Sequence, residues 1–218
     1  MKNKNIITID GPSASGKGSL AKAIAKKLDF ILLDSGLLYR AYAYLFNRIQ
    51  KHEKVIQLFS ALKIDIVENE MQVFENNANI TEVLRQEDIA ILASKISSSK
   101  KTRDNLINYQ RELATEYGLV ADGRDMGTIV FPNAATKIFL SASSHERARR
   151  RYQELLPNNP SLSLREVESD IQSRDLADKK RSISPLKPAD DSFIIDSSNL
   201  KQADVLDLAL KHYNNSIK

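Results

Sequence analysis

Apolar residues occur along this chain in two kinds of run that alternate. Short runs rich in β-branched residues predict buried strands at 5–10, 30–33, 119–121, 136–140 and 193–195. Between these runs, apolar residues recur at helical spacing and predict helices at 19–28, 36–51, 99–116, 144–156, 163–176 and 201–214. Strands that alternate with helices form a parallel sheet with helices on both faces. The pattern therefore predicts an α/β fold.

The segment 60–92 departs from this alternation. Apolar and polar residues alternate at 62–67 and again at 71–74, on either side of a polar turn, which is typical of an antiparallel hairpin. A third short strand is expected at Ile80. We interpret 60–92 as a small subdomain inserted into a core formed by 1–59 and 93–218. The alternative is that the hairpin forms an edge of the main sheet.

Composition narrows the classes of protein that remain. The 218 residues, 42% of them hydrophobic, are enough for one large domain with a buried core. The chain has no cysteine, which excludes disulfides, thiol catalysis and zinc–thiolate sites, and its three scattered histidines argue against a multi-histidine metal centre. The early apolar run is far too short for a signal peptide or a membrane span, so we expect a cytoplasmic protein without a membrane partner.

Charge alone decides little. Lysine and arginine outnumber acidic residues by 32 to 28, a net charge of +4 that fits an anionic ligand and equally an ordinary basic surface. Glycine is more informative, because all seven glycines lie in three short segments, at 11–18, at 36 and at 118–127. Glycine allows tight turns and close approach of the backbone to a ligand. We therefore expect the chemistry of the protein in these segments.

The first glycine segment has the pattern of a phosphate-binding loop. It lies between a predicted strand and a predicted helix, where backbone N–H groups and the positive helix end converge on phosphate oxygens. Lys17 supplies a charge for the β- and γ-phosphates. Gly18 stands where the strict pattern has a hydroxyl residue, so we assign the hydroxyl that faces Mg²⁺ to Ser19. The predicted ATP-binding residues are Gly11, Pro12, Ser13, Ala14, Ser15, Gly16, Lys17, Gly18 and Ser19.

The same residues also fit a dinucleotide-binding fingerprint. Gly16, Gly18 and Ala21 have the required spacing, and Asp34 lies near the place of a ribose-binding acid. The turn that begins at Gly11 is long for that motif, and a lysine within it favours a triphosphate. We therefore prefer the phosphate loop.

The other two glycine segments follow the second and third predicted strands, and so fall at the same carboxyl edge of the sheet. Ser35 and Arg40 can gather a second phosphate there, although Ser35 could simply cap a helix. Asp122 ends a strand at the position where a carboxylate commonly orients the ligands of magnesium. Arg124 and Asp125 beside it add opposite charges, with a structural ion pair as the alternative.

Arginines gather in the predicted helix 144–156. Arg147 and Arg151 are four residues apart on one helical face, and Arg150 lies alongside. We interpret the segment of about 145–165 as a lid that closes over ATP and excludes water. The alternative is a solvated helix in which Glu146 and Glu154 pair with these arginines.

Four motifs taken together resemble those of bacterial cytidylate kinases, which are nucleoside monophosphate kinases. They are, in order along nearly the whole chain, GPSASGKGS, LDSGLLYR, ADGRDMGTIVFP and RDLADKKRSISPLKPADD. The resemblance implies a phosphate-loop fold in which 60–92 binds the nucleoside monophosphate and a short helical lid covers ATP. It implies phosphorylation of CMP and dCMP by ATP with Mg²⁺.

The resemblance also implies a role for each matching residue. Catalysis is expected of Lys17, Asp122, Arg147, Arg150 and Arg151. The implied contacts with CMP are Ser35, Arg40, Arg124 and Arg181 near its phosphate, Arg174 and Asp178 at its ribose, and Ser94, Arg103 and Asp125 at its base. A carboxylate with an arginine complements the amine donor and the two acceptors of cytosine, whereas uracil would face the wrong partners.

Other functions remain as alternatives. The first is another small phosphate-loop kinase that acts on UMP or on a non-nucleotide acceptor. A GTPase-like switch is disfavoured because the chain has no Asn-Lys-x-Asp motif for guanine. Nucleic-acid binding is disfavoured because aromatic residues do not cluster on glycine-bearing strands. A monomer is expected, since the enzyme has to open and close.

Overall fold

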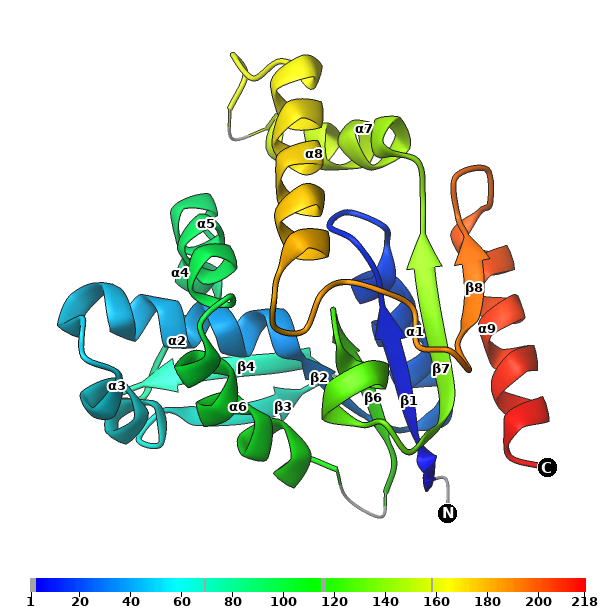
Figure 1. Cartoon of the computed structure of the whole chain (residues 1–218), viewed down its shortest axis with the longest axis horizontal. Coiled ribbons are helices and arrows are strands. Elements are labelled where there is room, and N and C mark those ends of the chain that lie inside the picture. The colour runs from blue at the N-terminus through cyan, green and yellow to red at the C-terminus, as the bar shows by residue number, and fades with distance from the viewer. Residues whose placement is uncertain (1–2, 69, 115–116, 158) are drawn as a thin grey trace.

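The computed structural model describes residues 3–68, 70–114, 117–157 and 159–218. At its centre is a parallel sheet with the strand order β2-β6-β1-β7-β8 (Figure 1). These strands are β1 (Asn3–Asp10), β2 (Ile31–Asp34), β6 (Leu119–Gly123), β7 (Ala134–Ser141) and β8 (Phe193–Asp196). The five predicted strands and the predicted parallel sheet are confirmed, with ends that differ by at most two residues.

Helices cover both faces of this sheet, as predicted. On one face, Ile7 and Ile9 of β1 belong to a buried cluster with α1 (Lys17–Leu28) and α9 (Gln202–Ser216). On the other, Ile6 and Leu33 belong to a cluster with α2 (Ser35–Ile49) and α6 (Lys100–Glu112). Because both faces are buried, the strands are nearly continuous apolar runs without the alternation of a half-exposed sheet.

A second, antiparallel sheet with the order β3-β4-β5 lies beside the first. Its strands are β3 (Lys63–Val67), β4 (Glu70–Glu75) and β5 (Ala78–Asn79). The hairpin is therefore not an edge of the main sheet, and that alternative was wrong. The third strand ends before Ile80, whose side chain is buried instead. Met71 and Val73 of β4 share the buried cluster of α2, so the small sheet is packed onto the core.

Three helices within or next to the segment 60–92 were not predicted. They are α3 (His52–Phe59), α4 (Thr81–Leu84) and α5 (Glu87–Ile96). All three are short, and their buried residues pack against neighbouring elements, which stabilises short helices that propensity alone does not. Of the helix predicted at 99–116, the structure has α6 at Lys100–Glu112, and residues 115 and 116 lie outside the described residues.

Two further helices, α7 (Ser144–Leu155) and α8 (Leu164–Lys180), pack against each other above the carboxyl ends of the strands (Figure 1). Both begin at serine caps: Ser143 accepts a hydrogen bond from the Glu146 N–H, and Ser163 forms a capping box with Glu166. Their contact is a small apolar cluster around Ala148, Val167 and Ile171, separate from the two clusters of the main body. Together, α7 and α8 form a lobe, which we call the lid lobe; the lid predicted at about 145–165 covers α7 and only the start of α8.

Within the described ranges, no helix is both long and apolar enough to cross a membrane.

Gly118 provides a test of the turn that leads into β6. Its φ of +98° is one that L side chains rarely adopt, and an added Cβ would lie 2.5 Å from the Phe30 ring. We expect Gly118→Ala to lower the free energy of unfolding by about 2–4 kcal/mol, from backbone strain and overpacking together. Urea denaturation measures this loss.

The Phe30→Ala background is the control for Gly118→Ala, because it removes the ring but keeps the strained backbone. There the second substitution should cost only about 1–2 kcal/mol. An equal cost in both backgrounds would contradict the clash.

Candidate active site

The turn between β1 and α1 has the geometry of an anion-binding loop. Gly16 precedes α1 with a φ of 90°, and as the N-cap it has no side chain to occupy the free N–H groups of the first turn. Gly11 lies so close to β7 that an added Cβ would be 2.1 Å from the carbonyl oxygen of Leu140. Both glycines are therefore required by the shape of the loop, and the positive end of α1 is open to a ligand.

Lys17, the first residue of α1, is half-buried and points back across this loop. Its Nζ donates a hydrogen bond to the carbonyl oxygen of Pro12 at 3.2 Å. Burial and the positive charge of Arg124 lower the pKa of Lys17 to about 8, although Asp122 and Asp34 act in the opposite direction. The ammonium is thus held in the loop with few solvent contacts and is available to a phosphate.

Two carboxylates lie side by side beneath the loop. Asp34 ends β2 and Asp122 lies opposite it on β6. Asp34 caps α2 by accepting a hydrogen bond from the Leu37 N–H at 3.0 Å. The alternative that Ser35 is the cap was therefore wrong. Burial raises the pKa of Asp122 to about 6. Among the described residues, the buried Asp122 Oδ1 has no hydrogen-bond partner.

A cavity of about 200 Å³ opens beside these carboxylates. Ser19 and Gly18 line it together with Asp34 and Asp122. The Oδ2 atom of Asp122 is directed at Gly18, where an added Cβ would lie 3.3 Å away. Oxygen donors from two strands and from α1 therefore meet next to the phosphate loop, at the place where the sequence predicts a magnesium ligand.

All the residues implied to bind CMP line one small cavity of about 150 Å³. They come from α2, α5, α6, α8 and the loop after β6, and they are Ser35, Arg40, Ser94, Arg103, Arg124, Asp125, Arg174, Asp178 and Arg181. Ser13 of the phosphate loop lines the same cavity. Segments that are up to about 150 residues apart in the sequence thus meet at one place.

Ion pairs connect several of the side chains that line this cavity. The buried guanidinium of Arg103 donates to Asp125 at 2.7 Å, and its Nε donates to the carbonyl oxygen of Ser97 at 2.7 Å. Asp178 accepts from Arg124 at 3.1 Å and also from Arg181. One carboxylate thus holds two guanidiniums at the same wall of the cavity. The alternative of a structural Arg–Asp pair is confirmed in part: Arg124 and Asp125 each form one, but with a more distant residue and not with each other.

Three of the nine residues, Ser35, Arg40 and Arg174, have partners outside the cavity. The Ser35 hydroxyl donates to the Gln110 side chain at 2.8 Å, and both groups are buried. Arg40 donates to the carbonyl oxygen of Leu84 at 3.2 Å, which ties α2 to the end of α4, and burial lowers the pKa of Arg40. Sequence reasoning missed Ser97 and Tyr39, which also line the cavity; the Arg103 guanidinium lies 5.5 Å from the centre of the Tyr39 ring.

The lid arginines diverge from one another. Arg147 is buried and donates to Asp175 of α8 at 2.5 and 3.1 Å, and also to the carbonyl oxygen of Ser13 at 3.2 Å. Arg150 donates to the carbonyl oxygens of Ser15 and Ser197, at 3.2 and 2.8 Å. Both arginines therefore brace the lid against the phosphate loop.

The alternative to a lid was a helix whose arginines pair with Glu146 and Glu154, and the pairing is confirmed. Arg150 pairs with Glu146 at 2.9 Å, and Arg151 pairs with Glu154 at 2.9 Å. Arg151 also pairs with Glu87 of α5. The arginines expected on one face of the helix thus contact different parts of the molecule.

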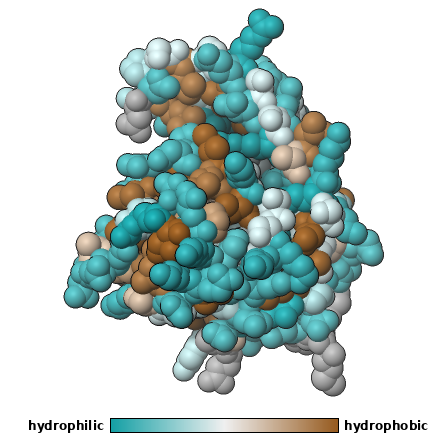
Figure 2. Space-filling view, turned by 60° about the vertical axis from the view of Figure 1, so that its left-hand side comes forward, coloured by the Kyte–Doolittle hydropathy of each residue, from teal (hydrophilic) through white to brown (hydrophobic). Residues whose placement is uncertain are grey.

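Two larger cavities flank the loop. One of about 660 Å³ lies between α1, α7 and the start of α9, and its lining includes the apolar Leu20 and Leu206 together with Arg149. The other, of about 650 Å³, lies between α4–α5 and the lid helices. Figure 2 shows that the surface is hollowed between the lid lobe and the rest of the molecule.

Known proteins resemble this chain over nearly its full length. The family model of cytidylate kinase matches residues 7–215. A cytidylate kinase of Pasteurella multocida is 42% identical, with 97% of this chain and 96% of the relative covered. Cytidylate kinase 1 of Haemophilus influenzae is 40% identical over 95% and 92%, and a cytidylate kinase of Vibrio cholerae is 39% identical over 97% and 97%. The chain belongs to the cytidylate kinase family.

In this member of the cytidylate kinase family, Asp10 is a site residue that sequence reasoning missed. It ends β1 as a buried carboxylate and accepts hydrogen bonds from the N–H groups of Met126 and Gly127, both at 2.8 Å. These residues begin the π-helix η1 (Met126–Val130), directly after Arg124 and Asp125. Asp10 therefore fixes the loop that carries two predicted CMP ligands. The one signal in the sequence is an acidic residue that ends a buried apolar strand.

Asp10→Asn tests this anchor. The amide NH₂ cannot accept from an N–H, so one backbone donor loses its partner, and the free energy of unfolding should fall by about 1–3 kcal/mol. Burial raises the pKa of Asp10 to about 7, above the ordinary value of 3.8. Between these values the folded wild type binds the extra proton, so its stability falls as pH rises, whereas asparagine does not titrate. The stability gap should therefore narrow from pH 5 to pH 7.5 in urea denaturation.

Asp196→Asn is the matched control for Asp10→Asn. Asp196 also ends a strand of the sheet, but it is exposed, and hydrogen bonds from Ser198 lower its pKa. Its titration is complete below pH 5, so its replacement should give a stability gap that does not change with pH. If the Asp10→Asn gap were equally flat, Asp10 would not titrate in the proposed range.

Proposed function

We propose that this protein transfers the γ-phosphoryl group of ATP to CMP, and to dCMP, and releases ADP with CDP or dCDP. The observation that carries the proposal is the single cavity lined by all nine implied CMP ligands, with Ser13 of the phosphate loop in its wall. An acceptor bound in this cavity would lie next to a triphosphate bound by the loop. Membership of the cytidylate kinase family supports the same substrates.

Phosphoryl transfer between two phosphates needs little covalent help from the protein. The acceptor phosphate has a second pKa near ~6, so it is largely a dianion at neutral pH and attacks without a general base. An oxygen of CMP forms the new bond to the γ-phosphorus while the bond to the ADP oxygen breaks. The main barrier is the repulsion between two polyanions, which positioned cations remove.

Lys17 and the arginines supply those cations. Lys17 would contact the β- and γ-phosphates from within the loop, because its Nζ already lies across it beside the Pro12 carbonyl. Arg124 and Arg181 would receive the acceptor phosphate, and both are held by Asp178 at the cavity wall. The phosphate dianion brings two charges to a pair of guanidiniums that share one carboxylate. The phosphate can therefore replace Asp178 as the hydrogen-bond acceptor of these two guanidiniums when CMP binds.

The base would be read by the buried Arg103–Asp125 pair. Asp125 can accept from the exocyclic amine of cytosine, and Arg103 can donate to its ring acceptors. Their bond at 2.7 Å fixes both groups in a buried wall. Uracil would present an N–H and a carbonyl to partners of the wrong kind, which leaves buried polar groups unpaired.

The nucleoside of ATP has space in the cavity of about 660 Å³ beside the loop. Leu20 and Leu206 give that cavity apolar walls, as ligand sites for aromatic groups usually have. Arg150 lies between this cavity and the loop, where it donates to the Ser15 carbonyl. Closure of the lid around this cavity would exclude water, which would otherwise compete for the phosphoryl group.

The residues beside Asp122 fit a magnesium ion. Mg²⁺ prefers oxygen ligands and is commonly bound by one or two carboxylates together with substrate phosphates and water. Asp122 has a buried Oδ1 that lacks a partner in the described part of the chain, and Ser19 and Asp34 line the same cavity. These residues would hold the ion, which neutralises charge on the β- and γ-phosphates when bound.

The proposal includes a monomer in the cytoplasm. Its two substrates are cytoplasmic metabolites, and every implied ligand for both comes from this one chain. A lid that closes within one chain does not require a partner subunit.

A panel of nucleoside monophosphates tests the choice of base. With ATP and Mg²⁺, kcat/KM for CMP and dCMP should exceed that for UMP, AMP or GMP by about a hundredfold, as two mispaired buried groups imply. Asp125→Asn should narrow the gap between CMP and UMP, because its amide can donate to the O4 atom of uracil. Equal rates with CMP and UMP in the wild type would refute the cytosine assignment and favour a kinase of broader specificity.

Removal of the positive charge of Lys17 tests its role in phosphoryl transfer. Lys17→Ala should lower kcat/KM for ATP by more than about a hundredfold, since it removes a cation next to the transferred group. In the wild type, a pKa of about 8 means that the free lysine loses its proton as pH rises through that value. The kcat/KM for ATP should therefore fall above about pH 8.

The control for Lys17 is Lys26→Ala, an exposed lysine on the same helix. It should leave both the rate and the pH profile unchanged. A wild-type profile that stays level up to pH 10 would show that Lys17 is not the titrating cation.

A further inference from the structure

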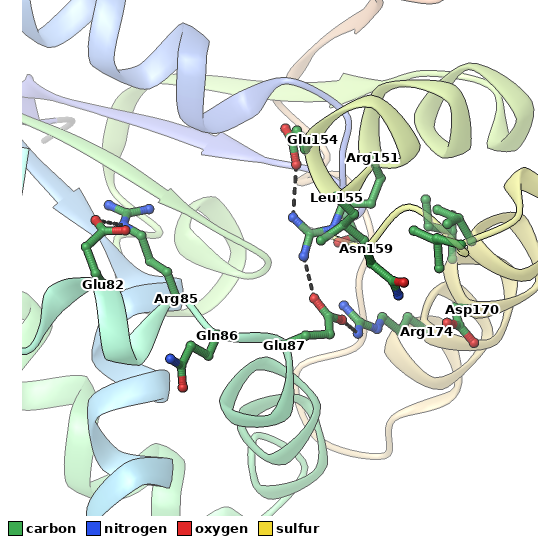
Figure 3. Close-up of a pocket in the computed structure, with 14 residues that line it drawn as sticks. Glu82, Arg85, Gln86, Glu87, Arg151, Glu154, Leu155, Asn159, Asp170 and Arg174 are labelled. Carbon is green, nitrogen blue, oxygen red and sulfur yellow. Dashed lines mark hydrogen bonds and ion pairs between the residues drawn. The ribbon is translucent and has the colours of Figure 1, made fainter. Parts of the chain in front are cut away.

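One carboxylate joins the lid to the acceptor side of the cleft. Glu87, the first residue of α5, accepts from Arg151 of α7 through Oε2 and from Arg174 of α8 through Oε1 (Figure 3). It lies at the cavity of about 650 Å³ between α4–α5 and the lid helices. Neither the motifs nor the family resemblance assigned Glu87 a role, although both of its partners were implied to contact nucleotides.

Glu87 begins the helix that forms one wall of the acceptor cavity, although its own side chain lines the neighbouring cavity. On the same helix, Ala90 and Ser94 lie three and seven residues further on, which places them on the same face as Glu87. Both line the small cavity that contains the implied CMP ligands. A displacement of α5 against CMP would therefore displace Glu87 and the two arginines that it holds.

The geometry leaves both arginines able to bind a ligand while Glu87 holds them. A guanidinium has five N–H donors. Arg174 uses one of these on Glu87, and Arg151 uses one on Glu87 and one on Glu154. Each can thus give further hydrogen bonds to a ribose hydroxyl or a phosphate oxygen without leaving the carboxylate.

Electrostatics favour the same arrangement. Two guanidiniums so close together repel each other, and a shared carboxylate between them offsets that repulsion. Burial acts to raise the pKa of Glu87, but the guanidiniums of Arg174 and Arg151 outweigh it and hold the pKa below its ordinary value. Glu87 is therefore ionised at neutral pH. Because the side chains are a quarter to two-fifths exposed, the pairs matter more for orientation than for stability.

We propose that Glu87 is a positioning residue for phosphoryl transfer. Its carboxylate holds Arg151 of the lid and Arg174 of the acceptor site on one anchor, so that the acceptor-binding helix and the lid adopt their places together. The inference rests on the proposed function for its kinetic consequence. The holding of the two arginines is a property of the free protein.

Glu87→Gln is the test variant. It keeps the size of the side chain, but the amide NH₂ faces one arginine and removes the charge that attracts both. We expect kcat with ATP and CMP to fall about tenfold and the KM for CMP to rise about threefold, since misplaced groups weaken transfer more than binding. The KM for ATP should stay within about twofold, because the phosphate loop is not touched. An unchanged or faster kcat would overturn the proposal.

Asp88→Asn is the matched control. It removes one negative charge from the same first turn of α5, so any effect of the helix dipole or of net charge is equal. Asp88 is exposed, it does not line the cavity that Glu87 lines, and it forms no ion pair with any residue that the structure describes. Wild-type kinetics are expected for this variant. A loss equal to that of Glu87→Gln would assign the effect to charge at the helix end and overturn the proposal.

A double-mutant cycle separates positioning from a structural role. If Glu87 acts through Arg151, the loss in kcat for Glu87→Gln combined with Arg151→Gln should be close to that of Arg151→Gln alone. Losses that multiply would mean that the two residues act independently. That result would overturn the proposal, even if each single variant is slow.

The free protein provides a readout that does not depend on activity. The chain has no cysteine, so Ile91→Cys on α5 and Arg165→Cys on α8 give two unique and exposed sites for spin labels. Without nucleotide, the distance distribution between the labels should broaden with Glu87→Gln but not with Asp88→Asn. Unchanged distributions would show that Glu87 does not hold the lid. A wild type that fails to phosphorylate CMP would refute the proposed function and leave this readout valid.

Discussion

The concentration of positive charge at one edge of the sheet is the constraint on which the structure depends. Cations that are to bind two polyphosphates have to lie close together before any anion arrives, and there they repel one another. The protein gives nearly every such cation an internal acceptor. Carboxylates serve most of them, as Asp178 does for Arg124 and Arg181, and backbone carbonyls serve Lys17 and Arg40.

This way of holding cations also connects the moving parts. Arg147 and Arg150 of the lid donate to carbonyl oxygens of the phosphate loop, and Arg151 reaches the acceptor side through Glu87. The lid thus contacts both nucleotide sites through side chains that nucleotides would themselves contact. Each substrate can exchange an internal acceptor for its own oxygen atoms. Under the proposed function, the binding of either substrate would therefore change the contacts that hold the lid.

The second support of the site is a buried carboxylate. Asp10 accepts two backbone N–H groups at the start of η1, and so fixes the loop with Arg124 and Asp125 relative to β1. Gly127 is required at that point, because an added Cβ would lie 2.8 Å from the Thr8 hydroxyl. The central strand β1 thus positions two loops. The phosphate loop follows its end, and its last side chain, Asp10, holds the loop that carries Arg124 and Asp125.

The sequence by itself determined the elements whose signals are local. The β-branched runs, the helical spacing and the glycine loop with Lys17 predicted the parallel sheet and the place of its site, because such patterns depend on neighbours along the chain. Only the tertiary structure decided the partners of the charges. Arg103 with Asp125, Arg151 with Glu87 and Asp10 with η1 are 22 to 116 residues apart, and their pairing requires the folded chain to bring them together. The tertiary structure also decided that α5 is a helix, because this short element is stabilised by packing against α2.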